Sequence, residues 1–234
     1  MLFIFMLSAL AGFSQKPDTA FISASISYSK QLYHTRMKGE WPLNSGGQYI
    51  AYASIEGEHP YFIKAWSNGS VQYLDDVYDN VLLLLDLRGD RLIMQHPLYD
   101  INIELSPQKV KSFALAGHWF INLRQDSIKT LPESGYYDIL QSGTVSVIAK
   151  RKKTIKRTLS SGKTVAILKE SNLYYLLKDA KTIQVKSGKS ILNALGDLPD
   201  LKRQLKKNKV KFGQNREAGL AETVRIYNEL VKVQ

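Results

Sequence analysis

The segment at positions 81–95 reads VLLLLDLRGDRLIMQ, in which two apolar runs flank a short polar turn. Runs of this length bounded by Gly and Asp are typical of β-strands. We therefore predict that Val81–Leu87 and Arg91–Gln95 form a hairpin around Arg88-Gly89-Asp90. The chain is apolar at every position from Val81 to Leu85, which indicates a strand buried on both faces.

The same pattern recurs on both sides of this hairpin. Between Gly46 and about Lys153, short runs rich in Tyr, Val, Ile and Phe alternate with Gly, Asp, Asn and Pro. This spacing is typical of antiparallel strands. Further hairpins are predicted around Ala116-Gly117, Ser142-Gly143 and Asp179-Ala180. The strands are therefore expected to form a meander, a sandwich or a barrel-like body.

The period of the apolar residues changes from two to about 3.6 after position 186, which indicates helices. The predicted helices are Ser190–Leu195, one that opens around Asp197 and Pro199, and Asn215–Lys232. The last helix has an apolar stripe that should pack on the body, formed by Leu220, Val224, Tyr227 and Val231. The predicted fold class is α+β, an antiparallel β-rich body followed by a C-terminal helical segment.

The charge of the chain is concentrated in its C-terminal part. Residues 1–142 contain 11 Lys and Arg against 14 Asp and Glu, whereas residues 143–234 contain 21 against 7, a net charge of +14. A segment of this kind suits polyanions, including nucleic acid, anionic lipid headgroups and acidic polysaccharide.

The densest basic cluster is the best candidate for binding an anionic partner. Its six cations repel one another unless they are solvated or partnered, so we expect them in solvent. A solubilising face without a partner is the alternative. The surrounding stretch, Lys150–Lys163, is polar and is also the best candidate for a linker. The six candidate residues are Lys150, Arg151, Lys152, Lys153, Lys156 and Arg157.

The N-terminal segment resembles a signal peptide. Leu2–Phe13 is an apolar run of the right length for an h-region and is shorter than a membrane span. Gly12 and Ser14 are small residues two positions apart, so cleavage is predicted near Ser14 or Gln15. No Lys or Arg precedes the run, which leaves the position of the start codon open. A buried N-terminal strand or helix is the alternative.

The chain contains no cysteine. This excludes disulfides, thiolate zinc sites, a cysteine nucleophile and a lipid-modified cysteine. Together with the N-terminal run, it predicts an exported protein, periplasmic or extracellular, with no transmembrane span in the mature chain.

No group of residues specifies a catalytic reaction, and no catalytic residue, metal site or cofactor is predicted. Gly162-Lys163-Thr164 resembles the end of a P-loop, but position 157, where the first glycine would stand, is Arg157. The four histidines show no pair at ligand spacing. The acidic loop with Asp75, Asp76 and Asp79 lacks the glycine and terminal Glu of a calcium loop.

Several residue groups resemble an uncharacterised family of secreted proteins from Bacteroidota. The resemblance implies an envelope or secreted location and carries no activity and no site residue to this chain. The groups are Gly69-Ser70-Val71-Gln72-Tyr73, Tyr78-Asp79-Asn80-Val81, Lys150-Arg151-Lys152-Lys153-Thr154-Ile155, Lys186-Ser187-Gly188-Lys189-Ser190 and Lys206-Lys207-Asn208-Lys209-Val210-Lys211-Phe212.

These patterns predict three regions: a signal peptide at 1–15, a β-rich body at 16–153, and a basic hairpin with helices at 154–234. The preferred hypothesis is a non-enzymatic envelope or secreted binding or scaffold protein, with the basic part contacting an anionic partner. The alternatives are a secreted hydrolase acting on polysaccharide or peptide, and a nucleic-acid-binding protein. Oligomeric state is not indicated by any pattern.

Overall fold

The computed structural model describes residues 20, 23–26, 28–29, 32, 37–52, 59–160, 163–196, 198–213 and 215–232. The predicted signal peptide at 1–15 and Gly162 of the P-loop-like triplet lie outside the described residues. The chain divides into two compact units, Met1–Trp41 and Pro42–Gln234. The first contains the 3-10 helix η1 (Lys38–Glu40), and the second begins with η2 (Pro42–Ser45).

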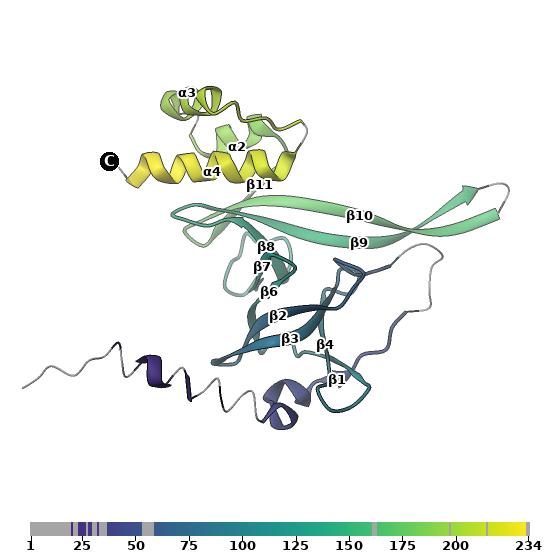
Figure 1. Ribbon diagram of the computed structural model, residues 1–234. Helices are drawn as coiled ribbons and strands as arrows, with labels where there is room; N and C mark the ends of the chain where they lie inside the picture. The colour runs from purple at the N-terminus through teal and green to yellow at the C-terminus, as the bar shows by residue number, and fades with distance from the viewer. Residues whose placement is uncertain are drawn as a thin grey trace, which may run out of the picture. The chain divides into compact units, whose positions relative to one another are not determined.

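The second unit contains an antiparallel sheet of 11 strands in the order β1-β5-β4-β3-β2-β6-β7-β8-β9-β10-β11 (Figure 1). With three helices that follow, it confirms the predicted α+β class. The strands are β1 (Gly47–Gln48), β2 (Ser67–Tyr73), β3 (Asp76–Asp86), β4 (Arg91–Gln95), β5 (Asn102–Glu104), β6 (Val110–Leu115), β7 (His118–Leu123), β8 (Gly135–Gln141), β9 (Ser146–Ser160), β10 (Lys163–Lys178) and β11 (Lys181–Val185).

The predicted hairpins are confirmed. In two of them, the backbone angles of the turn residues explain why the chain reverses there. β6 and β7 are joined by Ala116 and Gly117, with φ of 51° and 80°. β10 and β11 are joined by Asp179 and Ala180, with φ of 49° and 55°. Two successive residues with positive φ match the right-handed twist of a two-residue hairpin.

The sheet is strongly curved, so strands that are distant in the strand order approach each other around a shared core. The backbone N–H of Lys153 on β9 donates to the carbonyl oxygen of Leu87 after β3 at 3.2 Å, although four strands separate β3 from β9 in the sheet. Large side chains from several strands are fully buried in this unit, among them Tyr73, Tyr78, Phe113, Phe120, Leu83, Leu85, Leu92 and Met94.

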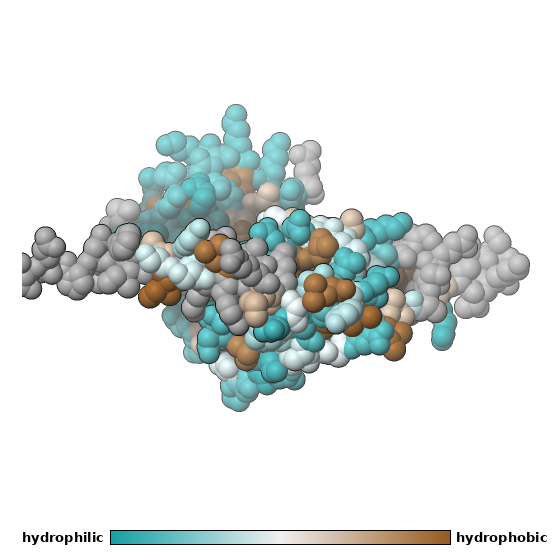
Figure 2. All heavy atoms as spheres, turned by 60° about the horizontal axis from the view of Figure 1, so that its bottom comes forward, coloured by the Kyte–Doolittle hydropathy of each residue, from teal (hydrophilic) through white to brown (hydrophobic). Residues whose placement is uncertain are grey.

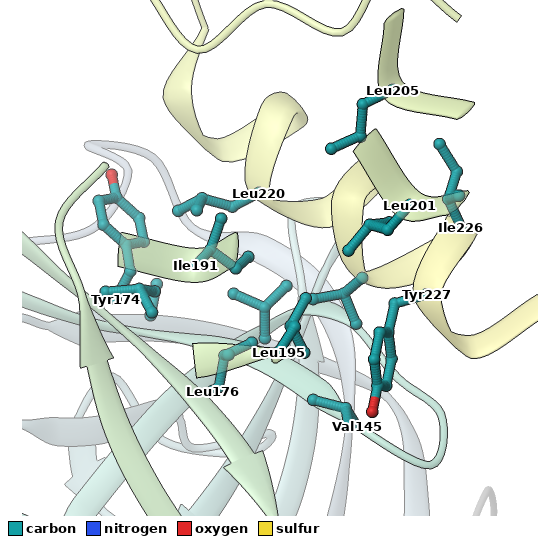
Figure 3. Packing of buried hydrophobic residues seen from close by; sticks show 14 residues of the cluster. Val145, Tyr174, Leu176, Ile191, Leu195, Leu201, Leu205, Leu220, Ile226 and Tyr227 are labelled. Carbon is teal, nitrogen blue, oxygen red and sulfur yellow. The ribbon is translucent and has the colours of Figure 1, made fainter. Parts of the chain in front are cut away.

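Three helices follow the sheet: α2 (Gly188–Ala194), α3 (Pro199–Lys207) and α4 (Arg216–Lys232). α2 and α4 pack on the β8–β11 end of the sheet, and α3 packs on α4. Ser187 caps α2 by accepting a hydrogen bond from the backbone of Ser190. Figure 3 shows apolar side chains of the three helices gathered with strand residues such as Leu176 in one cluster. The predicted stripe on α4 is buried at Leu220 and Val224, which confirms its docking role.

β9 and β10 form a hairpin much longer than its neighbours. They pair from Ser146 opposite Leu177 to Ser160 opposite Lys163, whereas β8 reaches β9 only as far as Ala149. The outer part, residues 154–160 and 163–169, is a two-stranded ribbon, which we call the arm (Figure 1). The prediction of a linker at 150–163 is therefore wrong. The predicted boundary between 153 and 154 falls inside β9.

Candidate functional site

The run of four cations from Lys150 to Lys153 lies in the middle of β9, where successive side chains point to opposite faces of the sheet. Lys150 is 1% exposed, Arg151 6% and Lys153 8%. The prediction that these side chains lie in solvent is therefore wrong for three of the four. A buried cation needs a partner inside the fold, and each one has it.

Lys150 is neutralised by the turn between β3 and β4. Its Nζ donates to Asp90 Oδ2 at 2.7 Å and to the carbonyl oxygen of Tyr136 at 3.2 Å. The Nζ also lies 5.0 Å from the ring centre of Tyr137. Burial raises the pKa of Asp90, and the charge of Lys150 opposes this rise. Lys150 therefore fixes β9 to a turn 60 residues earlier in the chain.

Arg151 joins the sheet to the last helix. Its Nε donates to Asp138 Oδ2 on β8 at 2.8 Å, and its two Nη atoms donate to the Glu217 carboxylate on α4, each at 2.9 Å. Asp138 is fully buried and also contacts Nδ1 of His118 at 2.8 Å. The Tyr174 hydroxyl donates to Glu217 at 3.0 Å. One polar network thus connects four strands with α4.

The charges in this network stabilise one another. Burial opposes ionisation of Glu217, but the hydrogen bonds and charge of Arg151 outweigh burial and lower the pKa of the Glu217 carboxyl. Burial also opposes the charge of Arg151, whose pKa is nevertheless raised by Glu217 and Asp138. Arg151 and Glu217 are therefore charged at neutral pH, and their ion pair holds α4 to β9.

Lys152 and Lys153 complete the set. Lys152 is partly exposed and pairs with Glu133 in the loop before β8. Lys153 donates to the carbonyl oxygen of Tyr61 at 2.9 Å, and its Nζ lies 3.8 Å from the Glu170 carboxylate. All four cations of the run therefore have partners, and the run stabilises the fold from within.

The remaining two candidates, Lys156 and Arg157, lie on the arm and are exposed, as is Lys169 on the facing strand. Among the residues that the structure describes, no acidic side chain pairs with any of the three. The sequence from 154 to 169 contains four Lys and Arg and no Asp or Glu. The structure thus divides the predicted cluster into an internal part and an unpaired part on the arm.

A second basic surface was missed as a site by the sequence analysis. Leu201 and Leu205 of α3 are buried against the helical core, so the opposite side of the helix faces solvent. Figure 2 shows the helical part of the molecule as a predominantly hydrophilic region. The exposed cations at the end of α3 and just after it are Lys206, Lys207, Lys209 and Lys211.

Other features of the described residues are weaker candidates for a catalytic, metal-binding or ligand-binding site. A shallow cavity of about 340 Å³ beside β1 includes one carboxylate, Glu104, which is paired with Arg91. No three His, Asp or Glu side chains in the described part of the chain gather as metal ligands. The described helices include none that is long and apolar enough to cross a membrane.

Comparison of the chain with protein-family models, curated proteins and solved structures finds no match. The strongest local feature is therefore the positive charge of Lys156, Arg157 and Lys169 on the arm, which no acidic side chain in the described part of the chain neutralises.

Proposed function

We propose that this protein is an exported binding or scaffold protein of the cell envelope or the secreted space, which contacts an anionic partner through its basic C-terminal part. The observation that carries the proposal is the contrast within β9. The cations at 150–153 are paired inside the fold, whereas Lys156 and Arg157 project into solvent and form no ion pair with any acidic side chain of the described residues. The proposed contact surface therefore starts at Thr154, after the four internal cations at 150–153.

The shape of the arm supports this role. Seven residues of β9 from Thr154 to Ser160 extend about 20 Å at strand rise, beyond the point where Lys153 contacts Leu87. Because the ribbon projects from the sheet, a polyanion can approach its charges from several sides. At physiological salt these charges attract a polyanion over about a Debye length, roughly 8 Å.

We expect the arm to bind a soluble polyanion in a salt-dependent manner, with a sulfated polysaccharide column as the probe. The triple variant Lys156→Gln, Arg157→Gln, Lys169→Gln should elute at clearly lower salt than the unaltered protein, because three contacts to the polyanion are lost. The fold should survive, since these side chains are exposed.

The matched control removes three other exposed cations of the same unit, by Lys64→Gln, Lys109→Gln and Lys129→Gln. Both variants lose the same net charge, so a general charge effect would shift both equally. Equal shifts, or an unaltered protein that does not bind at low salt, would contradict the proposal.

The export part of the proposal rests on the apolar run Leu2–Phe13 and on the resemblance to secreted proteins of Bacteroidota. We expect intact-mass spectrometry of the protein isolated from its native cells to give a chain that begins near Gln15 or Lys16. A cytoplasmic species that retains the apolar run would refute export and favour nucleic acid as the partner.

A further inference from the structure

We propose that the partner of the arm is a lipid bilayer with anionic headgroups, and that apolar side chains on one face of the arm insert into it. This inference rests on the proposed function and names the partner of the same surface.

One face of the arm combines apolar groups with a cation. Side chains two apart on a strand share a face, so Ile155, Arg157 and Leu159 point the same way. Leu168 on β10 lies opposite Ile155 and continues this face. Ile155 is 41% exposed and Leu159 is 74% exposed. Aliphatic groups this exposed on a projecting element have no role in the core of the fold.

The other face supplies cations that can reach headgroups. Lys156 and Lys169 point away from Leu159, and each carries its ammonium at the end of a long aliphatic stem. Such stems let a charge reach the headgroup layer while neighbouring apolar groups enter the acyl boundary. A shallow insertion of the arm therefore satisfies its charged and its aliphatic side chains together.

The charge distribution of the whole chain would orient this contact. Residues 1–142 have a net charge of −3, so an anionic surface attracts only the C-terminal part. The arm projects beyond the rest of the sheet (Figure 1), and Leu159 is the second-last residue of β9 in this projecting part.

Two other occupants fit the arm less well. A second copy of the arm would add its own positive charges along the open strand edges, and lysine on an edge is a known device against such pairing. Single-stranded nucleic acid is bound by stacking bases on aromatic rings, and residues 154–169 contain no Phe, Tyr, Trp or His.

Insertion can be measured directly because the chain has no cysteine. The variant Leu159→Cys places one environment-sensitive fluorophore at the proposed insertion point, and Leu98→Cys places it at another exposed leucine of the same unit, 66% exposed. With vesicles of phosphatidylglycerol and phosphatidylcholine, the label at 159 should gain intensity and shift to the blue. The label at 98 should not, and pure phosphatidylcholine should affect neither.

Affinity for the same vesicles, measured by co-sedimentation, should fall about tenfold in Leu159→Ser. The substitution removes a leucine side chain that is partly buried in the bilayer when the arm is bound. Each of Lys156→Gln, Arg157→Gln and Lys169→Gln should weaken binding up to about fivefold. Leu159→Ser should leave elution from the sulfated polysaccharide unchanged.

The outcomes separate the two proposals. Binding to the polysaccharide without binding to vesicles would overturn the lipid inference and leave the anionic-partner proposal standing. Vesicle binding with no change at label 159, or with equal losses in Leu159→Ser and Leu98→Ser, would overturn insertion. Tighter binding to duplex DNA than to vesicles would replace lipid by nucleic acid.

Discussion

Replacing Arg151 with alanine should lower the free energy of unfolding by about 3–5 kcal/mol, although this residue belongs to a run that looks like a solvated basic patch. The change leaves Asp138 without its cation at a position that is fully buried. It also removes the ion pair between Glu217 and β9, and leaves Glu217 only its hydrogen bond from the Tyr174 hydroxyl. Urea unfolding at neutral pH measures the effect.

The matched control is Arg157→Ala, which removes the same side chain from the same face of β9, six positions further along. Because Arg157 is exposed and unpaired among the described residues, its loss should change the free energy of unfolding by no more than about 0.5 kcal/mol. If the two variants were equally stable, Arg151 would not be held in the ion-pair network, and the internal role of the run would be refuted.

Because the cations at 150–153 are held inside the fold and those on the arm are exposed, binding should be tested with variants of the arm only. Replacing Lys150 through Lys153 together by serine would break ion pairs to the β3–β4 turn, to β8 and to α4. A loss of binding in such a protein would report unfolding. Variants confined to the arm avoid the problem because they touch no internal pair.

The strands of the sheet were predictable because their turns are set by local chemistry. Ala116-Gly117 and Asp179-Ala180 stand where two residues must adopt positive φ, and glycine or aspartate near such a position is a short-range signal. The buried stripe of α4 was predictable for a similar reason, since its period of 3.6 is visible within one helix.

The partners of the basic run were not predictable from local patterns, because they are distant in the sequence. Asp90 is 60 residues from Lys150, and Glu217 is 66 residues from Arg151. One signal was present: Asp138 interrupts the apolar strand Tyr136–Leu140. A carboxylate in a strand that is otherwise buried requires a cation from a neighbouring strand.

The stretch Lys150–Lys163, which includes the β9 half of the arm, was predicted to be a linker because its residues are polar and basic. Composition alone does not distinguish a solvated ribbon from a flexible connection. Pairing of β9 with β10 over fifteen positions makes it a strand. The apolar residues Ile155, Leu159 and Ile167 at intervals within the basic stretch were the available sign of a structured element.

Val224→Asp should lower the free energy of unfolding by a few kcal/mol, or detach α4 from the sheet, because the new carboxylate must be desolvated among apolar side chains. Val224 is 0% exposed and belongs to the apolar cluster that joins α4 to α2, α3 and the sheet. Thermal unfolding followed by circular dichroism at neutral pH measures the change.

The control for this prediction is Ala218→Asp on the same helix, which adds the same carboxylate at an exposed position in the first turn. There the charge meets the positive end of the helix dipole, so stability should be unchanged or slightly higher, by up to about 1 kcal/mol. A melting temperature of Val224→Asp equal to that of Ala218→Asp would mean that the stripe does not hold α4 to the sheet.

The apolar stripe and the Arg151–Glu217 pair both hold α4 to the sheet. If Val224→Asp is destabilised, Ala218→Asp is not, and Arg151→Ala loses a similar amount of stability, both contacts would act on the same docking of the helix. The double variant would then lose less than the sum of the two single losses, because an α4 that has already left the sheet no longer gains from its ion pair.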